Sequence, residues 1–139
     1  MQMTVKVING QVRNGLKNIA RAVPKVAFRH IWRLMTNAME RRKEYPPPPP
    51  NSTYKRTGNF GGSVRLEKLS AGVVGARLSV GVDYAPYVGG YATGEGQAEI
   101  HSGRWELTAD IVQAEVTDQI AEEVDADLQR VINQQGMGL

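Results

Sequence analysis

The strongest constraint on the fold is a run of five consecutive prolines, from Pro46 to Pro50. Proline lacks a backbone N–H and has a fixed φ, so this run fits neither a helix interior nor a central strand. It favours an extended polyproline II conformation with a rise of about 3.1 Å per residue. We therefore expect residues 44–56 to form a proline-rich loop. A stiff spacer is the favoured interpretation, and a recognition peptide for an aromatic-lined groove is the alternative.

Before this loop, residues 11–43 have the apolar spacing of one amphipathic helix. Pro24 should kink this helix or break it in two near Val23, because it removes a hydrogen bond and clashes with the preceding turn. At about 100° per residue, one core-facing stripe forms an arc of about 80°. Its members are Leu16, Ala20, Val23, Ala27, Ile31, Leu34 and Ala38.

The same helix carries two further surfaces. A second apolar group lies outside the core stripe and consists of Phe28, Trp32, Met35 and Met39. Basic residues recur every fourth position and sweep across the side away from the core; they include Arg21, Lys25, Arg29 and Arg33. Aromatic, Met and Arg side chains are enriched at protein interfaces, so we interpret both sets as a subunit contact. The alternative is that a loop or the C-terminal helix of the same chain covers the apolar group.

The charges are divided unequally along the chain. Residues 1–68 carry 14 lysines and arginines against three acidic residues, whereas residues 69–139 carry three against eleven. This split indicates attraction between neighbouring copies or a basic face turned toward DNA. Pairing of the basic N-terminal helix with the acidic C-terminal helix of the same chain is an equally supported alternative.

The remaining segments predict a small sheet between the helices. Residues 63–69 and 73–82 alternate apolar and polar side chains and should form an antiparallel hairpin. At the N-terminus, Val5 and Val7 alternate with Thr4 and Lys6, which predicts a short strand from Met3 to Ile8. The segment 83–88 should end the second strand, because Pro86 cannot lie within a ladder.

A glycine-rich segment and a second helix follow the predicted hairpin. Residues 89–104 should form a mobile loop, and they lack the Gly-Lys-Ser/Thr ending of a phosphate-binding loop. The C-terminal helix should begin at Thr108, whose hydroxyl can cap it, and it carries six carboxylates on its polar surface. A solvated acidic face is favoured over a cation site. Together these elements predict one α+β domain over residues 1–139, with a long N-terminal helix and a C-terminal helix packed on a small, mainly antiparallel sheet.

Composition limits the chemistry that the chain can perform. Cysteine is absent, which excludes disulfides and thiolate metal sites. The only histidines are His30 and His101. His101 near Trp105 and Glu106 is the one group that merits a test for acid-base or metal chemistry, but it has no second ligand or nucleophile. We expect no enzyme activity, no metal and no cofactor. No apolar run approaches the roughly 20 residues of a membrane helix, and no signal peptide is recognisable, so we expect a soluble cytoplasmic protein at synthesis.

Three segments in a fixed order carry a resemblance to a known family. They read YPPPPPNSTYKRTGNFGGS from Tyr45, DYAPYVGG from Asp83 and HSGRW from His101, and their order and spacing extend over roughly half of the chain. This set resembles the neck and tail-completion proteins of tailed bacteriophages, the head-tail joining proteins of long-tailed phages. The motif residues are Tyr54, Arg56, Thr57, Gly58, Ser63, Tyr84, Pro86, Tyr87, Val88 and Trp105. Phe60 stands where the family commonly has Leu, and Gly61-Gly62 where it commonly has basic residues.

The resemblance implies a structural virion protein located in the neck or tail, and in the host cytoplasm during assembly. It implies a homo-oligomeric ring of six or twelve subunits that contacts head-closure, tail-terminator or tail-tube proteins, with neither a membrane nor a small-molecule substrate as partner. Contact with DNA in the lumen is left open. A tail terminator or minor tail protein is the nearby alternative, and a small basic nucleic-acid-binding protein is the distant one.

Overall fold

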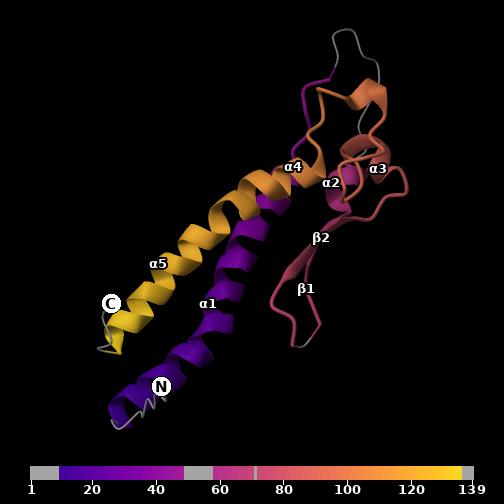
Figure 1. Cartoon of the computed structure of the whole chain (residues 1–139). Coiled ribbons are helices and arrows are strands. Elements are labelled where there is room, and N and C mark those ends of the chain that lie inside the picture. The colour runs from indigo at the N-terminus through magenta and orange to yellow at the C-terminus, as the bar shows by residue number, and fades with distance from the viewer. Residues whose placement is uncertain (1–9, 49–57, 71, 136–139) are drawn as a thin grey trace, which may run out of the picture.

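The computed structural model of the chain describes residues 10–48, 58–70 and 72–135. Its longest element is helix α1 (Gly10–Lys43), and a second long helix, α5 (Asp118–Gln134), runs beside it (Figure 1). A two-stranded antiparallel sheet packs on α1. The predicted α+β class, with two terminal helices and a small antiparallel sheet, is confirmed. The predicted strand at residues 3–8 and residues 49–57 of the proline-rich loop lie outside the described residues.

Helix α1 runs through Pro24 as one element, so of the predicted kink or break near Val23 the break does not occur, and the kink stays a prediction. The helix ends at Lys43, directly before the proline run, as the sequence predicted. Basic residues in its last turn, Arg41, Arg42 and Lys43, complement the negative end of the helix dipole.

Strands β1 (Val64–Lys68) and β2 (Ala76–Val80) form the predicted hairpin. Val64 pairs with Val80 and Leu66 with Leu78, so the apolar residues of both strands share one face. The second strand is shorter than predicted. After it the chain forms the short helix α3 (Ala85–Gly89), where Pro86 lies in the first turn and its missing N–H breaks no bond.

Short helical elements connect the hairpin to the two long helices. They are α2 (Asn59–Gly62), η1 (Glu99–His101), α4 (Thr108–Val112) and the π-helical turn η2 (Gln113–Thr117). α4, η2 and α5 follow one another without a gap, so they form one C-terminal helix with a widened turn near its start. Leu107, not Thr108, precedes this helix, and no side chain caps it. The predicted Thr108 cap is therefore wrong, because its hydroxyl instead bonds a side chain of α1.

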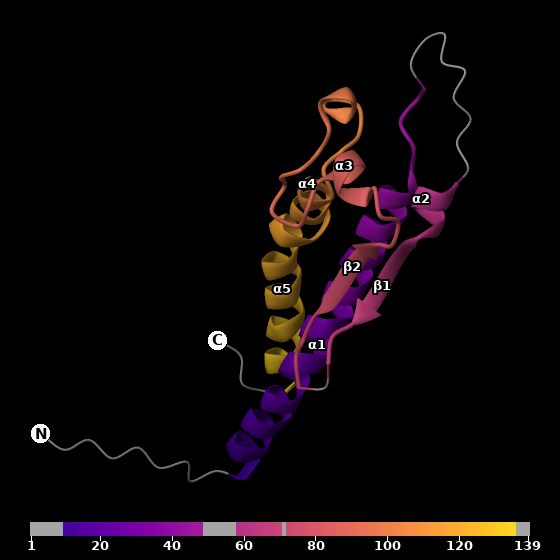
Figure 2. The ribbon, with the colours of Figure 1, turned by 90° about the vertical axis from the view of Figure 1, so that its right-hand side faces the viewer.

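The core lies where the C-terminal half of α1 meets α4, η2 and the inner face of the sheet. Its buried members are Leu34, Met35, Ala38, Ile111 and Val116, and Ile31, Leu66, Ala76, Leu78, Val112 and Ile120 pack around them. Figure 2 shows why the core sits there: the hairpin runs along α1 on one side, while α4 and α5 follow it on another.

Two predictions about the surfaces of α1 are wrong. Met35, assigned to a second exposed face, lies in the core. Leu16, Ala20 and Val23, assigned to the core-facing stripe, are exposed. The buried cluster joins α1 to the sheet, α4 and η2 only from Ile31 onward, whereas α5 contacts a different arc of α1 that contains His30. The apolar stripe at the start of α1 therefore has no cover within the described residues.

Candidate assembly surfaces

The end of α1 holds a buried cation. Arg42 is only 2% exposed, and its Nη1 donates to the Glu106 carbonyl oxygen at 2.7 Å and to Thr108 Oγ1 at 2.9 Å. Its guanidinium carbon lies 5.2 Å from the ring centre of Phe60 and 5.9 Å from that of Trp105, within cation–π range. Burial lowers the pKa of Arg42 from its usual value. The Nε atom is buried without a hydrogen-bond partner in the described part of the chain.

Aromatic rings close over this arginine from three separate segments. The ring centres of Tyr45 and Trp105 lie 5.4 Å apart, and those of Phe60 and Trp105 5.2 Å apart, both edge to face. The Tyr45 hydroxyl accepts a hydrogen bond of 2.8 Å from the backbone of Gly61. Tyr45 and Phe60 belong to the first of the three segments that carry the family resemblance, and Trp105 belongs to the third. We call these three rings with Arg42 the Arg42 node.

The glycine-rich segment is fastened to the same region. Gln97 Nε2 donates to the carbonyl oxygens of Val88 at 2.8 Å and Trp105 at 2.9 Å, and the Ala98 N–H donates to the Tyr87 carbonyl oxygen at 2.7 Å. These bonds tie the middle of the loop to α3 and to Trp105 of the Arg42 node. The loop contains the turn η1, which the sequence did not predict, and its mobility stays a prediction.

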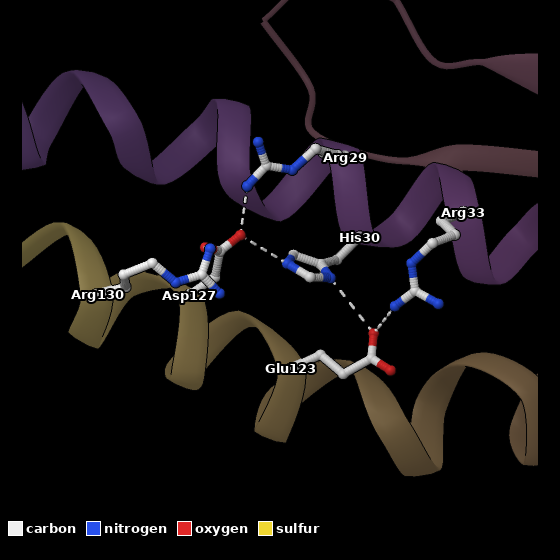
Figure 3. Close-up of polar contacts among 6 residues, drawn as sticks. All are labelled: Arg29, His30, Arg33, Glu123, Asp127 and Arg130. Carbon is white, nitrogen blue, oxygen red and sulfur yellow. Dashed lines mark hydrogen bonds and ion pairs between the residues drawn. The ribbon is translucent and has the colours of Figure 1, made fainter.

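Along their length, α1 and α5 are joined by a charged seam (Figure 3). Asp127 accepts from Arg29 and lies 2.9 Å from His30 Nε2, while Glu123 accepts from Arg33 and lies 3.3 Å from His30 Nδ1. His30 thus stands between two carboxylates with one ring nitrogen toward each. The sequence did not indicate these partners for His30.

Asp127 is the centre of the seam. Arg130 adds a third contact, with 3.0 Å between its Nη1 and the second carboxylate oxygen. The hydrogen bond from His30, followed by that from Arg29, lowers the pKa of Asp127, because each stabilises the carboxylate. Asp127 is buried, and its contacts with Arg29, His30 and Arg130 offset the free-energy cost of removing its carboxylate from water.

A second ion cluster lies near the Arg42 node. Arg41 Nε donates to Glu106 Oε2 at 2.9 Å and its Nη1 to Glu115 Oε1 at 3.0 Å. The hydrogen bond from Arg41 lowers the pKa of Glu106, and both carboxylates raise the pKa of Arg41. Since Arg41 occupies the Glu106 carboxylate, the predicted grouping of His101 with Glu106 does not form a free acid-base pair.

No metal-binding group of His, Cys, Asp and Glu side chains occurs in the described ranges. His101 packs edge-on at 6.3 Å from the centre of the Trp105 ring, and its Nδ1 is buried without a partner there. Burial lowers the pKa of His101, which favours the neutral ring. This placement gives His101 a packing role beside Trp105.

The basic surface predicted on α1 is divided in two. Arg29 and Arg33 are exposed but point to α5 and pair with its carboxylates. The pairing of basic and acidic helices within one chain, the alternative for the charge split, accounts for them. Arg21 and Lys25 are exposed and make no ion pair in the described part of the chain.

The predicted second apolar face is also divided. Phe28 stacks on Trp32 at 5.8 Å, and the Lys68 ammonium of β1 lies 4.7 Å from the centre of the Phe28 ring. The hairpin therefore covers part of this face, whereas the same-chain alternative named a loop or the C-terminal helix as the cover. Trp32 remains 37% exposed and Met39 is half-buried. The subunit contact itself stays a hypothesis for these residues.

An open groove lies between β2 and the start of the C-terminal helix. It has a volume of about 550 Å³. Its lining is mostly apolar and consists of Met35, Ala76, Leu78, Val80, Ala85, Pro86, Gly90, Ala92, Thr108, Ala109, Val112, Gln113 and Thr117. The π-helical turn supplies Gln113 and Thr117, and such turns are frequent at functional sites. No pattern in the sequence indicated this groove, because it depends on where the sheet ends.

The remaining motif residues have mainly structural positions. Gly58 adopts φ +80°, which the sequence predicted, and the Ser63 hydroxyl donates to the Phe60 carbonyl oxygen at 2.8 Å. Val88 is buried, whereas Tyr84 and Tyr87 are exposed beside the hairpin. Tyr54, Arg56 and Thr57 lie outside the described residues.

Comparison with other proteins adds no assignment to these surfaces. No protein-family model, curated protein or solved structure matches the chain. No helix in the described ranges is both long and apolar enough to cross a membrane. The candidate surfaces are therefore defined by geometry: the Arg42 node, the charged seam, the exposed start of α1 and the groove beside β2.

Proposed function

We propose that the chain is a structural virion protein of a tailed phage or prophage, a head-tail joining component of the neck that assembles as a ring of identical subunits. The observation that carries this proposal is the ordered set of three motifs that resembles this family. The packing of Tyr45 and Phe60 against Trp105, beside Arg42, supports it, because it brings the first and the third of these segments together in the fold.

The distribution of side chains also favours assembly over catalysis. The polar groups brought together are ion pairs of α1 with α5 and with Glu106, and the carboxylates in them are occupied by arginines. Large apolar side chains are instead left exposed, among them Leu16, Val23 and Trp32. Exposed apolar side chains that gather in patches mark contact surfaces. A ring of identical subunits needs two different contact faces on each subunit.

The proposal is tested by disrupting the gene in a phage that carries it. The expected lysate contains DNA-filled heads and separate finished tails under the electron microscope, and plaques reappear when the chain is supplied from a plasmid. Joined, infectious particles in the absence of the gene would overturn the proposal. Tails of abnormal length would favour the alternative of a tail terminator or minor tail protein.

Direct DNA binding through α1 is the weaker candidate. Arg29, Arg33 and Arg41 are neutralised by carboxylates of the same chain, which leaves a shorter basic stretch that includes Arg21 and Lys25. Binding to duplex DNA at low salt that weakens steeply as salt rises would support this candidate. Absence of binding at low salt removes it.

A further inference from the structure

The edge of β2 that faces the groove is free. The sheet has two strands, so β2 pairs with β1 on one side only within the described residues. Figure 2 shows β2 on the side of the hairpin nearer α4 and α5, which is also where the groove lies. An unpaired strand edge presents a row of N–H and C=O groups that can pair with another strand.

The register identifies which backbone groups are free. The Gly81 N–H donates to the Ser63 carbonyl oxygen, and the Leu69 N–H donates to the Gly75 carbonyl oxygen. In an antiparallel pair every second residue bonds to the partner strand, so within β2 the residues that bond to β1 are Arg77 and Ser79. The backbone groups of Ala76, Leu78 and Val80 therefore point away from β1. The side chains of these same three residues line the groove. The free backbone edge of β2 thus lies beside the apolar lining of the groove, an arrangement found in sites that bind an added strand.

The groove also selects the side chains of its occupant. Val112 lies opposite β2 across the groove, and the lining carries no Asp, Glu, Lys or Arg side chain among the described residues. An added strand should therefore place apolar residues at alternate positions toward the groove and polar ones toward water. The segment Met3–Ile8 of this chain has that pattern, with Val5 and Val7 on one face and Thr4 and Lys6 on the other.

The segment cannot reach the groove of its own subunit. Met35 in the groove is 25 residues after Gly10, about 37 Å along the helix at 1.5 Å per residue. The near end of β2 is also far from Gly10. Ala76 at that end pairs with Lys68, and the Lys68 ammonium lies over the ring of Phe28. Phe28 is 18 residues after Gly10, which is about 27 Å along the helix. Fully extended, Met3 lies at most about 25 Å from Gly10, and Ile8 about 7 Å.

We propose that residues 3–8 of one subunit add to β2 of a neighbouring copy as a third strand and fill the groove with Val5 and Val7. This contact is of the head-to-tail type, since the donor segment and the acceptor groove are different surfaces, and such contacts close into rings. The inference deepens the proposed function and rests on it for the expectation that the subunits form a ring.

Engineered cysteines test this contact, because the chain contains no cysteine of its own. One set of chains carries Val5→Cys, and a second, affinity-tagged set carries Ala76→Cys, Leu78→Cys or Val80→Cys. Adjacent strands lie about 4.8 Å apart, within the Cα separation that a disulfide spans. Lys6→Cys is the matched donor control and Arg77→Cys the acceptor control, because both positions belong to the opposite faces of their strands.

On mixing under mild oxidation, Val5→Cys should form a disulfide with at least one groove cysteine roughly tenfold faster than either control does, as expected for a pre-formed contact. Equal rates overturn the proposal, as does a disulfide that forms only within one chain when both cysteines are on it. A variant without residues 2–9 gives a second measurement. It should lose self-association in light scattering and bind a synthetic peptide of residues 2–9, and absence of peptide binding overturns the proposal.

These outcomes are separable from those of the phage experiment. If heads and tails fail to join without the gene but no cross-link forms, the strand exchange is wrong and the proposed function stands. If cross-links form but phage without the gene assembles normally, the function is wrong and the contact stands.

Discussion

The two halves of α1 have the same amphipathic pattern but different surroundings. From Ile31 to Lys43 the helix packs against the sheet, α4 and the Arg42 node, and even an arginine is buried there. Between Gly15 and Val23 the large apolar side chains Leu16 and Val23 are 48% and 40% exposed, whereas Leu34 is 1% exposed. The difference teaches that burial along one helix is decided by which elements run beside it, and not by the helix's own pattern.

The comparison also separates fold from assembly. The buried half determines how the chain folds, because large apolar side chains stabilise the folded state only when other groups cover them and remove them from water. An exposed apolar half is stable only at a cost in solubility unless a partner covers it. If burial decides the contribution of each half, substitutions in the buried half should lower the free energy of unfolding more than substitutions in the exposed half.

The largest effect should come from Arg42→Ala. This change removes a buried side chain that supports two hydrogen bonds and two aromatic rings, and it leaves a cavity and an unsatisfied carbonyl oxygen. We expect the free energy of unfolding to fall by about 3 to 5 kcal/mol in urea denaturation. The control is Arg41→Ala, the neighbouring arginine with partly exposed ion pairs, which should cost about 1 kcal/mol. Similar losses for both variants would contradict the buried role of Arg42.

A somewhat smaller effect is expected from Leu34→Ala, which creates a cavity in the core. The loss should be about 3 kcal/mol, within the usual range for buried leucine. Leu16→Ala, the same change in the exposed half, should cost at most about 0.5 kcal/mol in a dilute monomeric sample. Both values come from urea denaturation at several protein concentrations. A large loss for Leu16→Ala that grows with concentration would show that another copy covers the start of α1.

The seam between α1 and α5 should make stability depend on pH. The pKa of Asp127 is lower in the folded chain than its usual value of 3.8, so its contribution to stability is fully present above that value. That contribution is lost as the pH falls from about 4 through the folded pKa. Asp127→Asn should therefore lower stability at pH 6 and flatten its dependence on pH below about 4.

The matched control is Asp125→Asn, an exposed carboxylate on the same helix that makes no ion pair in the described part of the chain. Thermal unfolding followed by circular dichroism from about pH 6 to about pH 2.5 compares both variants with wild type. Asp125→Asn should follow the wild-type curve. An unchanged pH dependence in Asp127→Asn would mean that the seam does not hold the helices together.

The sequence predicted the elements better than their contacts. Alternation placed the hairpin, helical spacing placed α1, and the proline run placed its end, because each of these signals is local. The position of α5 along α1 depends on contacts between distant residues. For this reason Met35, predicted on a second face, is buried, and Val23, predicted in the core, is exposed. The opposite charges of the two helices led to a correct alternative, since carboxylates at positions 123 and 127 match arginines at positions 29 and 33.

The Arg42 node illustrates a contact that sequence could not predict. Arginine in the last turn of a helix normally interacts with the helix dipole in water, and nothing in its neighbours along the chain signals burial. Its aromatic partners come from residues 45, 60 and 105, and only the fold brings them together. Of these three aromatic residues only Trp105 is a motif residue of the family resemblance, and the resemblance did not indicate an arginine beside it.

The smallest effect should distinguish backbone strain from packing beside the Arg42 node. Gly58 has φ +80°, and no atom of the described residues lies within 4 Å of the position that an added methyl group would take, so Gly58→Ala tests mainly conformation. We expect a loss of about 1 kcal/mol, because side-chain-bearing residues avoid this region. Gly62 has equally open space but no positive φ, so Gly62→Ala should be neutral or slightly stabilising through a less flexible unfolded chain. If urea denaturation finds Gly58→Ala as harmless as Gly62→Ala, the start of α2 adapts to the new residue, and the rigid part of the fold begins only at the buried Phe60.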